Sequence, residues 1–126
     1  KQKINELNLQ NNIHSFGINK NTSQWYREFD FFTLSSVGES FPNVIGEALA
    51  SGIPIIATDA GDIKDIIENC GYCIKPKNPK LLAETWLKAI NLDSKSKKKL
   101  ALNCRKKALN CYDSKKINKS YWTFFD

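Results

Sequence analysis

The sequence predicts an α/β fold in which a parallel sheet is covered by helices on both faces. Two observations indicate this class. Predicted strands alternate with predicted helices along most of the 126 residues, as they do in βαβ units. The predicted strands are short apolar runs, such as residues 53–58, which suit strands that are buried on both faces. In such sheets ligands bind beyond the carboxyl ends of the strands, so we expect a functional site at that edge.

Apolar spacing, together with residues that cap or break elements, predicts five elements in the first half of the chain. These are a helix over residues 1–9, a strand over 13–16, a helix over 22–29, a strand over 30–35 and a helix over 42–51. Gly17 ends the first strand, and Asn21 or Thr22 caps the helix that follows. Pro42 fits the first turn of the third helix, where its missing N–H costs nothing, and Gly52 ends that helix.

The second half is predicted to add two strands, three more helices and a helix at the end of the chain. These are a strand over residues 53–58, a helix over 63–68, a strand over 72–74, a helix over 79–91, and a helical tail over about 94–125 that contains helices from residue 94 to 110 and from residue 114 onward. Asn78 and Pro79 suit the cap and first position of helix 79–91. Ser94 is the expected cap of the next helix, and Asp113 or Ser114 of the last.

Composition excludes several classes of protein. Hydrophobic residues make up 41% and charged residues 25%, which is ordinary for a globular protein and argues against disorder. No apolar run approaches the roughly 20 residues needed to cross a bilayer, and residues 1–12 are too polar for a signal peptide. The net charge is +6, with most of the excess after Ile90. A solvated helix face is the simplest interpretation, and nucleic acid, anionic lipid and anionic substrate are the alternatives.

The four cysteines are predicted to be reduced and structural. Cys70 and Cys73 have the spacing of redox and zinc motifs. A redox pair of this kind opens a helix, however, whereas a predicted strand begins at Tyr72. Cys104 and Cys111 are not spaced as a second pair of zinc ligands. Unpaired cysteines are typical of a cytoplasmic protein, so we expect that location.

Other candidate residues are interpreted as structural. His14, the one histidine, lies in a predicted strand and is expected to be structural rather than catalytic. Aromatic side chains on helix 22–29 are expected in the core, and they are Trp25, Tyr26 and Phe29. A second aromatic group ends the tail, at Tyr121, Trp122, Phe124 and Phe125. We expect its apolar face to be exposed or to be buried by self-association into a homo-oligomer.

Residues 39–47 carry the strongest signal for chemistry. Free N–H groups and the dipole at the start of the helix near Pro42 make an anion site that suits phosphate. Glu39 precedes that helix, and Glu47 lies about 6 Å along its axis from Asn43. A carboxylate can accept hydrogen bonds from two adjacent hydroxyls, so one glutamate suits a sugar and the other a ribose. We expect Glu47 to lie off the apolar stripe of the helix, which is formed by Val44, Ile45, Ala48 and Leu49.

Neither glutamate requires a function on physical grounds. A glutamate at a helix N-terminus is favourable by about 0.3–1 kcal/mol in any case, and a glutamate on an exposed helix face needs no explanation. A likeness of fold is a weak argument for function. The residues alone therefore leave the functional and the structural interpretation open.

A resemblance decides between them. Residues 39–48, which read ESFPNVIGEA, resemble the two-glutamate signature of the group 1 glycosyltransferases, the GT4 family of the GT-B fold. Further stretches similar to that family are residues 13–17, 25–30, 50–61, 71–72 and 77–83. The resemblance implies that residues 1–126 are part of a Rossmann-like C-terminal domain that binds a nucleotide sugar, with the acceptor domain absent.

The resemblance also implies roles for individual residues. Glu39 would contact hydroxyls of the transferred sugar as the catalytic carboxylate, and Glu47 would bind the ribose hydroxyls. Sugar and phosphate oxygens would be held by the backbone N–H groups of Ser40, Phe41, Asn43 and Val44. The implied donor is a UDP- or GDP-sugar, no metal or other cofactor is expected, and helix N-termini and cationic side chains neutralise the leaving diphosphate.

The implied reaction is transfer of a hexosyl group to a glycan or lipid-linked acceptor in polysaccharide biosynthesis, with retention of configuration. A place in the cytoplasm, with peripheral association at the inner face of the membrane, is compatible with it. The arginine and lysine that the family uses for the diphosphate belong to a stretch that this chain lacks, and Asp62 replaces a glycine found in many relatives. We therefore expect this chain alone to be inactive.

Two other functions are kept as alternatives. The first is a non-catalytic module that binds sugar nucleotides or a partner and has kept the fold. The second is a basic domain for nucleic acid or anionic membrane. We rank nucleic acid low, because the tail has few of the interleaved exposed aromatics expected of a single-strand binder.

Overall fold

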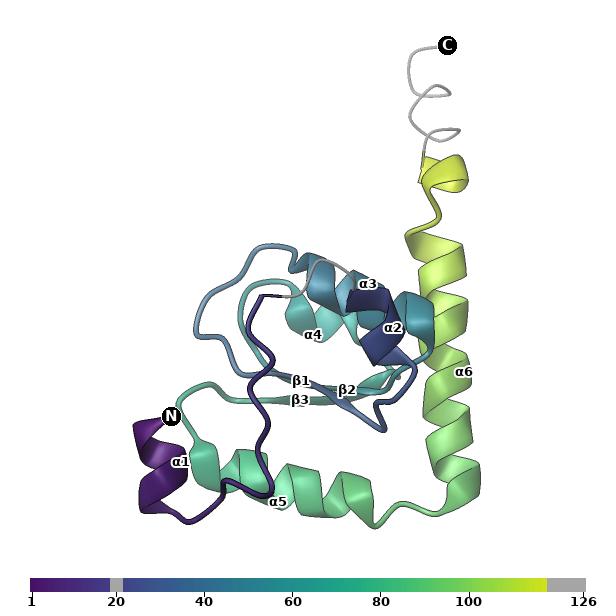
Figure 1. Cartoon of the computed structure of the whole chain (residues 1–126). Helices are drawn as coiled ribbons and strands as arrows, with labels where there is room; N and C mark the ends of the chain where they lie inside the picture. Colours follow the sequence, from purple (N-terminus) through teal and green to yellow (C-terminus); the bar gives the residue numbers. More distant parts are fainter. Residues whose placement is uncertain (19–21, 118–126) are drawn as a thin grey trace.

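The computed structural model describes residues 1–18 and 22–117 and contains a three-stranded parallel sheet with helices on both faces (Figure 1). The elements in chain order are α1 (Gln2–Glu6), α2 (Thr22–Tyr26), β1 (Phe32–Leu34), α3 (Asn43–Ser51), β2 (Ile55–Thr58), α4 (Ile63–Ile66), β3 (Gly71–Ile74), α5 (Pro79–Ile90) and α6 (Ser94–Cys111). The predicted fold class is confirmed.

The strands lie in the order β1-β2-β3, so β2 is central. Thr33 of β1 pairs with Ile56 of β2, and Ile56 pairs with Tyr72 of β3. Figure 1 shows α3 and α4 on one face of the sheet, α5 on the other, and α6 standing along one side. All four residues of β2 are buried, as expected for a strand covered on both faces.

The core lies between β2 and the helices α3, α4 and α6. Its largest fully buried side chains include Ile45 and Leu49 of α3, Ile55 of β2, Ile63 of α4 and Cys104 of α6. Burial of these side chains positions α3 against the sheet, since burying each large aliphatic side chain is worth about 1.5–3 kcal/mol. The N-terminus of α3 is therefore placed at the carboxyl end of β1.

The ends of α3 follow from two residues. Gly52 adopts the left-handed conformation, with φ of 73°, and its N–H donates to the Leu49 carbonyl, which is how many helices end. Pro42 is the N-cap in an extended conformation, one position before its predicted place in the first turn. The predicted extent of this helix is otherwise confirmed.

Of the caps predicted for α5 and α6, the structure confirms the first but not the second. The Asn78 side chain accepts a hydrogen bond from the Leu81 N–H at 3.0 Å, which confirms Asn78 as the cap of α5. Helix α6 is capped by Asp93 rather than by Ser94, because the Asp93 carboxylate accepts a bond from the Ser96 N–H at 2.8 Å. The prediction of Ser94 as a cap was wrong by one residue.

The predicted strand over residues 13–16 does not form. A strand needs a neighbouring strand to satisfy its backbone groups, and within the described ranges the sheet contains only β1, β2 and β3. Ile13 and Phe16 are exposed, and the Phe16 ring instead packs on the Trp25 ring with centroids 4.2 Å apart. His14 is also exposed, so it is not a core residue.

Several predicted helices are shorter in the structure. Helix 1–9 is reduced to α1, helix 22–29 to α2 and helix 63–68 to α4. Residues 114–117 are helical, which agrees with a helix that starts at Ser114. The aromatic group at residues 121–125 lies outside the described residues.

Candidate functional site

The loop between β1 and α3 holds Glu39 at the carboxyl edge of the sheet. The Ser36 hydroxyl donates a hydrogen bond to the Glu39 carboxylate at 2.7 Å. The Thr58 hydroxyl, at the end of β2, donates to the Ser36 carbonyl. Gly61 of the following loop packs so closely on Glu39 that a Cβ there would lie 2.0 Å from the Glu39 carbonyl oxygen. Loops from two neighbouring strands thus set the position of Glu39.

The N-terminus of α3 presents backbone donors beside this loop. Pro42 caps the helix with its backbone alone, and no side chain in the described part of the protein accepts from the first turn. The Ile45 N–H donates to the Pro42 carbonyl at 2.9 Å. The N–H groups of Asn43 and Val44 precede the first intrahelical bonds, so they remain available to an anion together with the positive end of the helix dipole.

Glu47 lies one helical turn inside α3, on the side that faces α2. The Thr22 hydroxyl donates to the Glu47 carboxylate at 3.3 Å, and the Tyr26 hydroxyl donates to the Val44 carbonyl at 3.3 Å. Burial raises the pKa of Tyr26 to about 12, and the nearby negative charge of Glu47 adds to the effect. Sequence reasoning missed both α2 residues as partners of Glu47.

The apolar stripe of α3 is narrower than predicted. Ile45, Ala48 and Leu49 are fully buried, whereas Val44 is 37% exposed. Val44 lies about 100° around the helix from Ile45, which turns its side chain out of the core. The carboxylate of Glu47 is exposed, as predicted. It is therefore available both to α2 and to a ligand.

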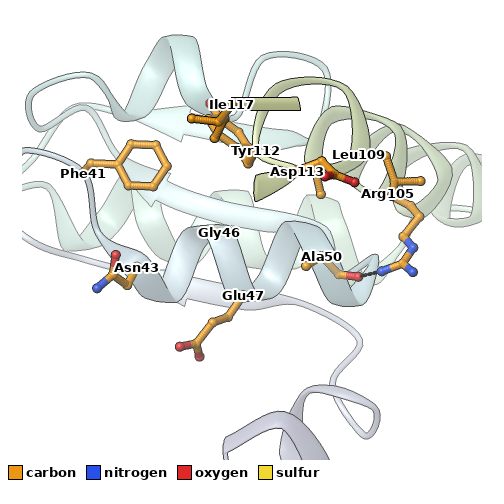
Figure 2. Close-up of a pocket in the computed structure, with 11 residues that line it drawn as sticks. Phe41, Asn43, Gly46, Glu47, Ala50, Arg105, Leu109, Tyr112, Asp113 and Ile117 are labelled. Carbon is orange, nitrogen blue, oxygen red and sulfur yellow. Dashed lines mark hydrogen bonds between the residues drawn. The ribbon is translucent and has the colours of Figure 1, made fainter. Parts of the chain in front are cut away.

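An apolar groove of about 780 Å³ runs along the opposite side of α3, between α3 and the C-terminal residues of the described chain. It is lined mainly by Phe41, Gly46, Ala50, Ala108, Leu109 and Tyr112. The Phe41 ring packs edge-on against the Tyr112 ring with centroids 5.3 Å apart. Asn43 and Glu47 also belong to the lining of this groove, although Figure 2 shows their side chains pointing away from the Phe41 and Tyr112 rings. The groove was not predicted from the sequence, because it forms only when α6 packs on α3.

The cysteines are free thiols, in agreement with the sequence prediction. Cys70 leads directly into β3 rather than into a helix, as expected. Cys104 of α6 donates to the Cys70 carbonyl at 3.4 Å, and both residues are buried. The proximity of the two thiols lowers the pKa of Cys70 and, together with burial, raises the pKa of Cys104. This pair fastens α6 to the sheet.

Across residues 1–18 and 22–117, no three histidine, cysteine, aspartate or glutamate side chains gather as ligands for a metal ion. None of the helices in those ranges has the length and apolar character to cross a membrane.

The sequence model of the family described as "Glycosyl transferases group 1" matches residues 1–91. An uncharacterized glycosyltransferase of Methanocaldococcus jannaschii, MJ1059, is 43% identical over 56 residues, which are 44% of this chain and 14% of that protein. The N-acetyl-alpha-D-glucosaminyl L-malate synthase of Bacillus anthracis is 25% identical over 126 residues, which are 98% of this chain and 33% of that protein.

A solved structure is similar over nearly the whole chain. Alr3699/HepE of Anabaena, in complex with UDP, has a TM-score of 0.91 at 26% identity, and the match covers 98% of this chain and 35% of HepE. The same protein in complex with UDP-glucose has a TM-score of 0.88. The chain thus spans between 14% and 35% of the lengths of these relatives.

Proposed function

The chain belongs to the group 1 glycosyltransferases, and from this membership we propose that residues 1–126 are part of the C-terminal, donor-binding domain of a longer glycosyltransferase. The extent of the similarity to HepE supports the proposal, because the match covers 98% of this chain but 35% of HepE. The acceptor domain belongs to the remainder of such a protein. This chain by itself would then bind its donor weakly and would not catalyse transfer.

The observation that carries the proposal is the placement of two carboxylates on either side of the N-terminus of α3. Free backbone N–H groups there, at Asn43 and Val44, suit the oxygens of a diphosphate. Glu47, one turn further, suits the two ribose hydroxyls, and Glu39 suits hydroxyls of the sugar. The backbone N–H groups of the preceding loop, at Ser40 and Phe41, complete the set of donors. In a nucleoside diphosphate sugar the diphosphate lies between the ribose and the sugar, as the N-terminus of α3 lies between Glu47 and Glu39.

The chemistry would be transfer of a hexosyl group, with retention of configuration. The bond between the anomeric carbon and the diphosphate breaks, a bond from the same carbon to the oxygen of an acceptor hydroxyl forms, and the proton of that hydroxyl passes to the leaving diphosphate. The positive end of α3, equivalent to roughly half an elementary charge, would stabilise the leaving diphosphate without a resident metal. Glu39 would orient the sugar through its hydroxyls. The donor would be a UDP- or GDP-sugar, and the acceptor a glycan or a lipid-linked acceptor in the cytoplasm.

Calorimetry on the whole protein tests the donor site. We expect a UDP- or GDP-sugar to bind and Glu47→Ala to weaken that binding at least about tenfold, because hydrogen bonds to a charged group are worth about 1.5–3 kcal/mol. Glu84→Ala is the matched control, since Glu84 is also exposed but lies on α5, across the sheet. A nucleotide that lacks the ribose hydroxyls should bind Glu47→Ala and the unchanged protein alike.

Two results would contradict the proposal. An unchanged affinity in Glu47→Ala would refute the ribose role of this residue. Failure of the whole protein to bind any sugar nucleotide would favour the non-catalytic module instead.

A further inference from the structure

Helix α6 is strongly basic. Its 18 residues include seven lysines and arginines and no aspartate or glutamate. Like charges four residues apart on a helix destabilise it slightly, so this charge does not serve the stability of the helix. The cationic residues are Lys95, Lys97, Lys98, Lys99, Arg105, Lys106 and Lys107.

Two of these cations have structural partners. Arg105 donates to the Ala50 carbonyl of α3. Lys107 donates to the Asp65 carbonyl at 3.2 Å and lies 3.7 Å from the Glu68 carboxylate. By contrast, four exposed lysines of α6 make no ion pair or side-chain hydrogen bond with any described residue, and they are Lys95, Lys98, Lys99 and Lys106.

These four lysines surround two exposed leucines on one face. Leu102 is 61% exposed, and Leu109, which also lines the edge of the groove between α3 and α6, is 47% exposed. At 3.6 residues per turn all four lysines and Leu109 lie within about 60° of Leu102 around the helix. The opposite face carries Cys104 and Ala108, which are buried in the core. The outer face of α6 is therefore itself amphipathic, because two exposed leucines lie among four lysines.

This combination distinguishes between possible partners. Phosphate groups of a nucleic acid would attract the lysines but would leave the leucines in water. A base-stacking surface requires exposed aromatic side chains, and this face has none. An anionic bilayer satisfies both kinds of side chain, because lysines pair with headgroups while leucines enter the boundary of the acyl chains. The patch continues past α6 at Lys115 and Lys116, which are exposed, and at Ile117, which is 50% exposed.

We propose that the outer face of α6, defined by Lys95, Lys98, Lys99, Leu102, Lys106 and Leu109, docks on the headgroup region of an anionic lipid bilayer. This inference goes beyond the proposed transfer reaction and does not depend on Glu39 or Glu47. The inner face of α6 packs on α3, so a docked α6 would hold the N-terminus of α3 at a fixed distance from the membrane surface. That arrangement suits an acceptor carried by a lipid.

Sedimentation with lipid vesicles tests the proposal on the whole protein. Phosphatidylcholine vesicles that contain phosphatidylserine should bind it, and vesicles of phosphatidylcholine alone should not. Each lysine near an anionic surface contributes about fivefold in affinity, so Lys98→Gln with Lys106→Gln should weaken binding roughly 25-fold. The matched control is Lys75→Gln with Lys80→Gln, which removes the same charge from exposed sites outside α6. Circular dichroism checks that all variants fold.

Leu102→Ser separates the two contributions to binding. We expect it to weaken vesicle binding while the net charge stays the same. Equal losses in the α6 pair and the control pair, or no binding of the unchanged protein to anionic vesicles, would overturn the proposal. Binding to a single-stranded oligonucleotide but not to vesicles, unaffected by Leu102→Ser, would also overturn it and would identify nucleic acid as the partner. Donor binding measured on the same variants should not change, so failure here is distinct from failure of the transferase proposal.

Discussion

Replacement of Gly61 by alanine probes how the loop after β2 holds the backbone at Glu39. Gly61 has φ of 63°, in the left-handed region that residues with side chains rarely adopt. A Cβ at this position would lie 2.0 Å from the Glu39 carbonyl oxygen, whereas ordinary contacts begin at 3.4 Å. The loop and the Glu39 backbone would therefore have to separate by about 1.4 Å.

Two costs add in this variant. The left-handed conformation costs alanine about 1–2 kcal/mol, and forcing an extra methyl group into a filled space costs about 1–3 kcal/mol. Gly52→Ala is the matched control, because Gly52 has φ of 73° but a Cβ there would lie 3.5 Å from its nearest neighbour, the Ala101 carbonyl oxygen. It should carry only the first cost.

Urea unfolding of both variants measures the difference. We expect Gly61→Ala to lose about 1–3 kcal/mol more stability than Gly52→Ala. If the donor site is as proposed, Gly61→Ala should also weaken sugar-nucleotide binding, because it displaces Glu39, and Gly52→Ala should not. Equal destabilisation with unchanged binding would refute the reasoning, since it would mean that the two loops separate without cost.

Two further predictions concern groups whose pKa is shifted. The pKa of Tyr26 is raised to about 12, so its contribution to stability is complete below pH ~10 and is lost as the pH rises toward ~12. The difference in unfolding free energy between the unchanged protein and Tyr26→Phe should therefore shrink over that range, by at most about 3 kcal/mol. Urea unfolding at several pH values measures this difference, and a constant difference would contradict the prediction. Hydrogen bonds from Ser96 lower the pKa of Asp93, so its contribution is present at neutral pH and is lost as the pH falls below about 4. Asp93→Ala should lower the urea midpoint by more at pH ~7 than at pH ~3, whereas Ser94→Ala should leave it unchanged at both; the opposite ranking would restore Ser94 as the cap.

The elements that could be predicted from sequence are those whose signals are local. Gly52 ends α3 through a conformation that glycine adopts without cost, and Asn78 caps α5 through a bond to a residue three positions away. The exposure of Glu47 followed from helical spacing. The N-cap of α6 was harder to predict, because Asp93 and Ser94 are adjacent and either side chain can accept a hydrogen bond from a backbone N–H of the first turn.

Features that depend on distant partners could not be predicted. Residues 13–16 carry a strand pattern, but a strand forms only beside another strand. The contact of Thr22 with Glu47 links residues 25 positions apart, and no spacing rule indicates it. The groove beside Phe41 likewise exists only because Tyr112 reaches it from α6. Long-range packing decides all three.

The dependence of α3 on α6 has a consequence for how the protein is made. The hydrogen bond from Asn103 to the Asn69 carbonyl spans 34 residues, and the one from Arg105 to the Ala50 carbonyl spans 55. After α3 has been synthesised, the ribosome must therefore add β2, α4, β3 and α5 before α6, the helix that covers α3, can emerge. During that interval the inner side of α3 is open to water and to other nascent chains. Contacts this far apart in sequence form slowly, so translation speed and chaperone access between residues 51 and 111 should influence the yield of folded protein.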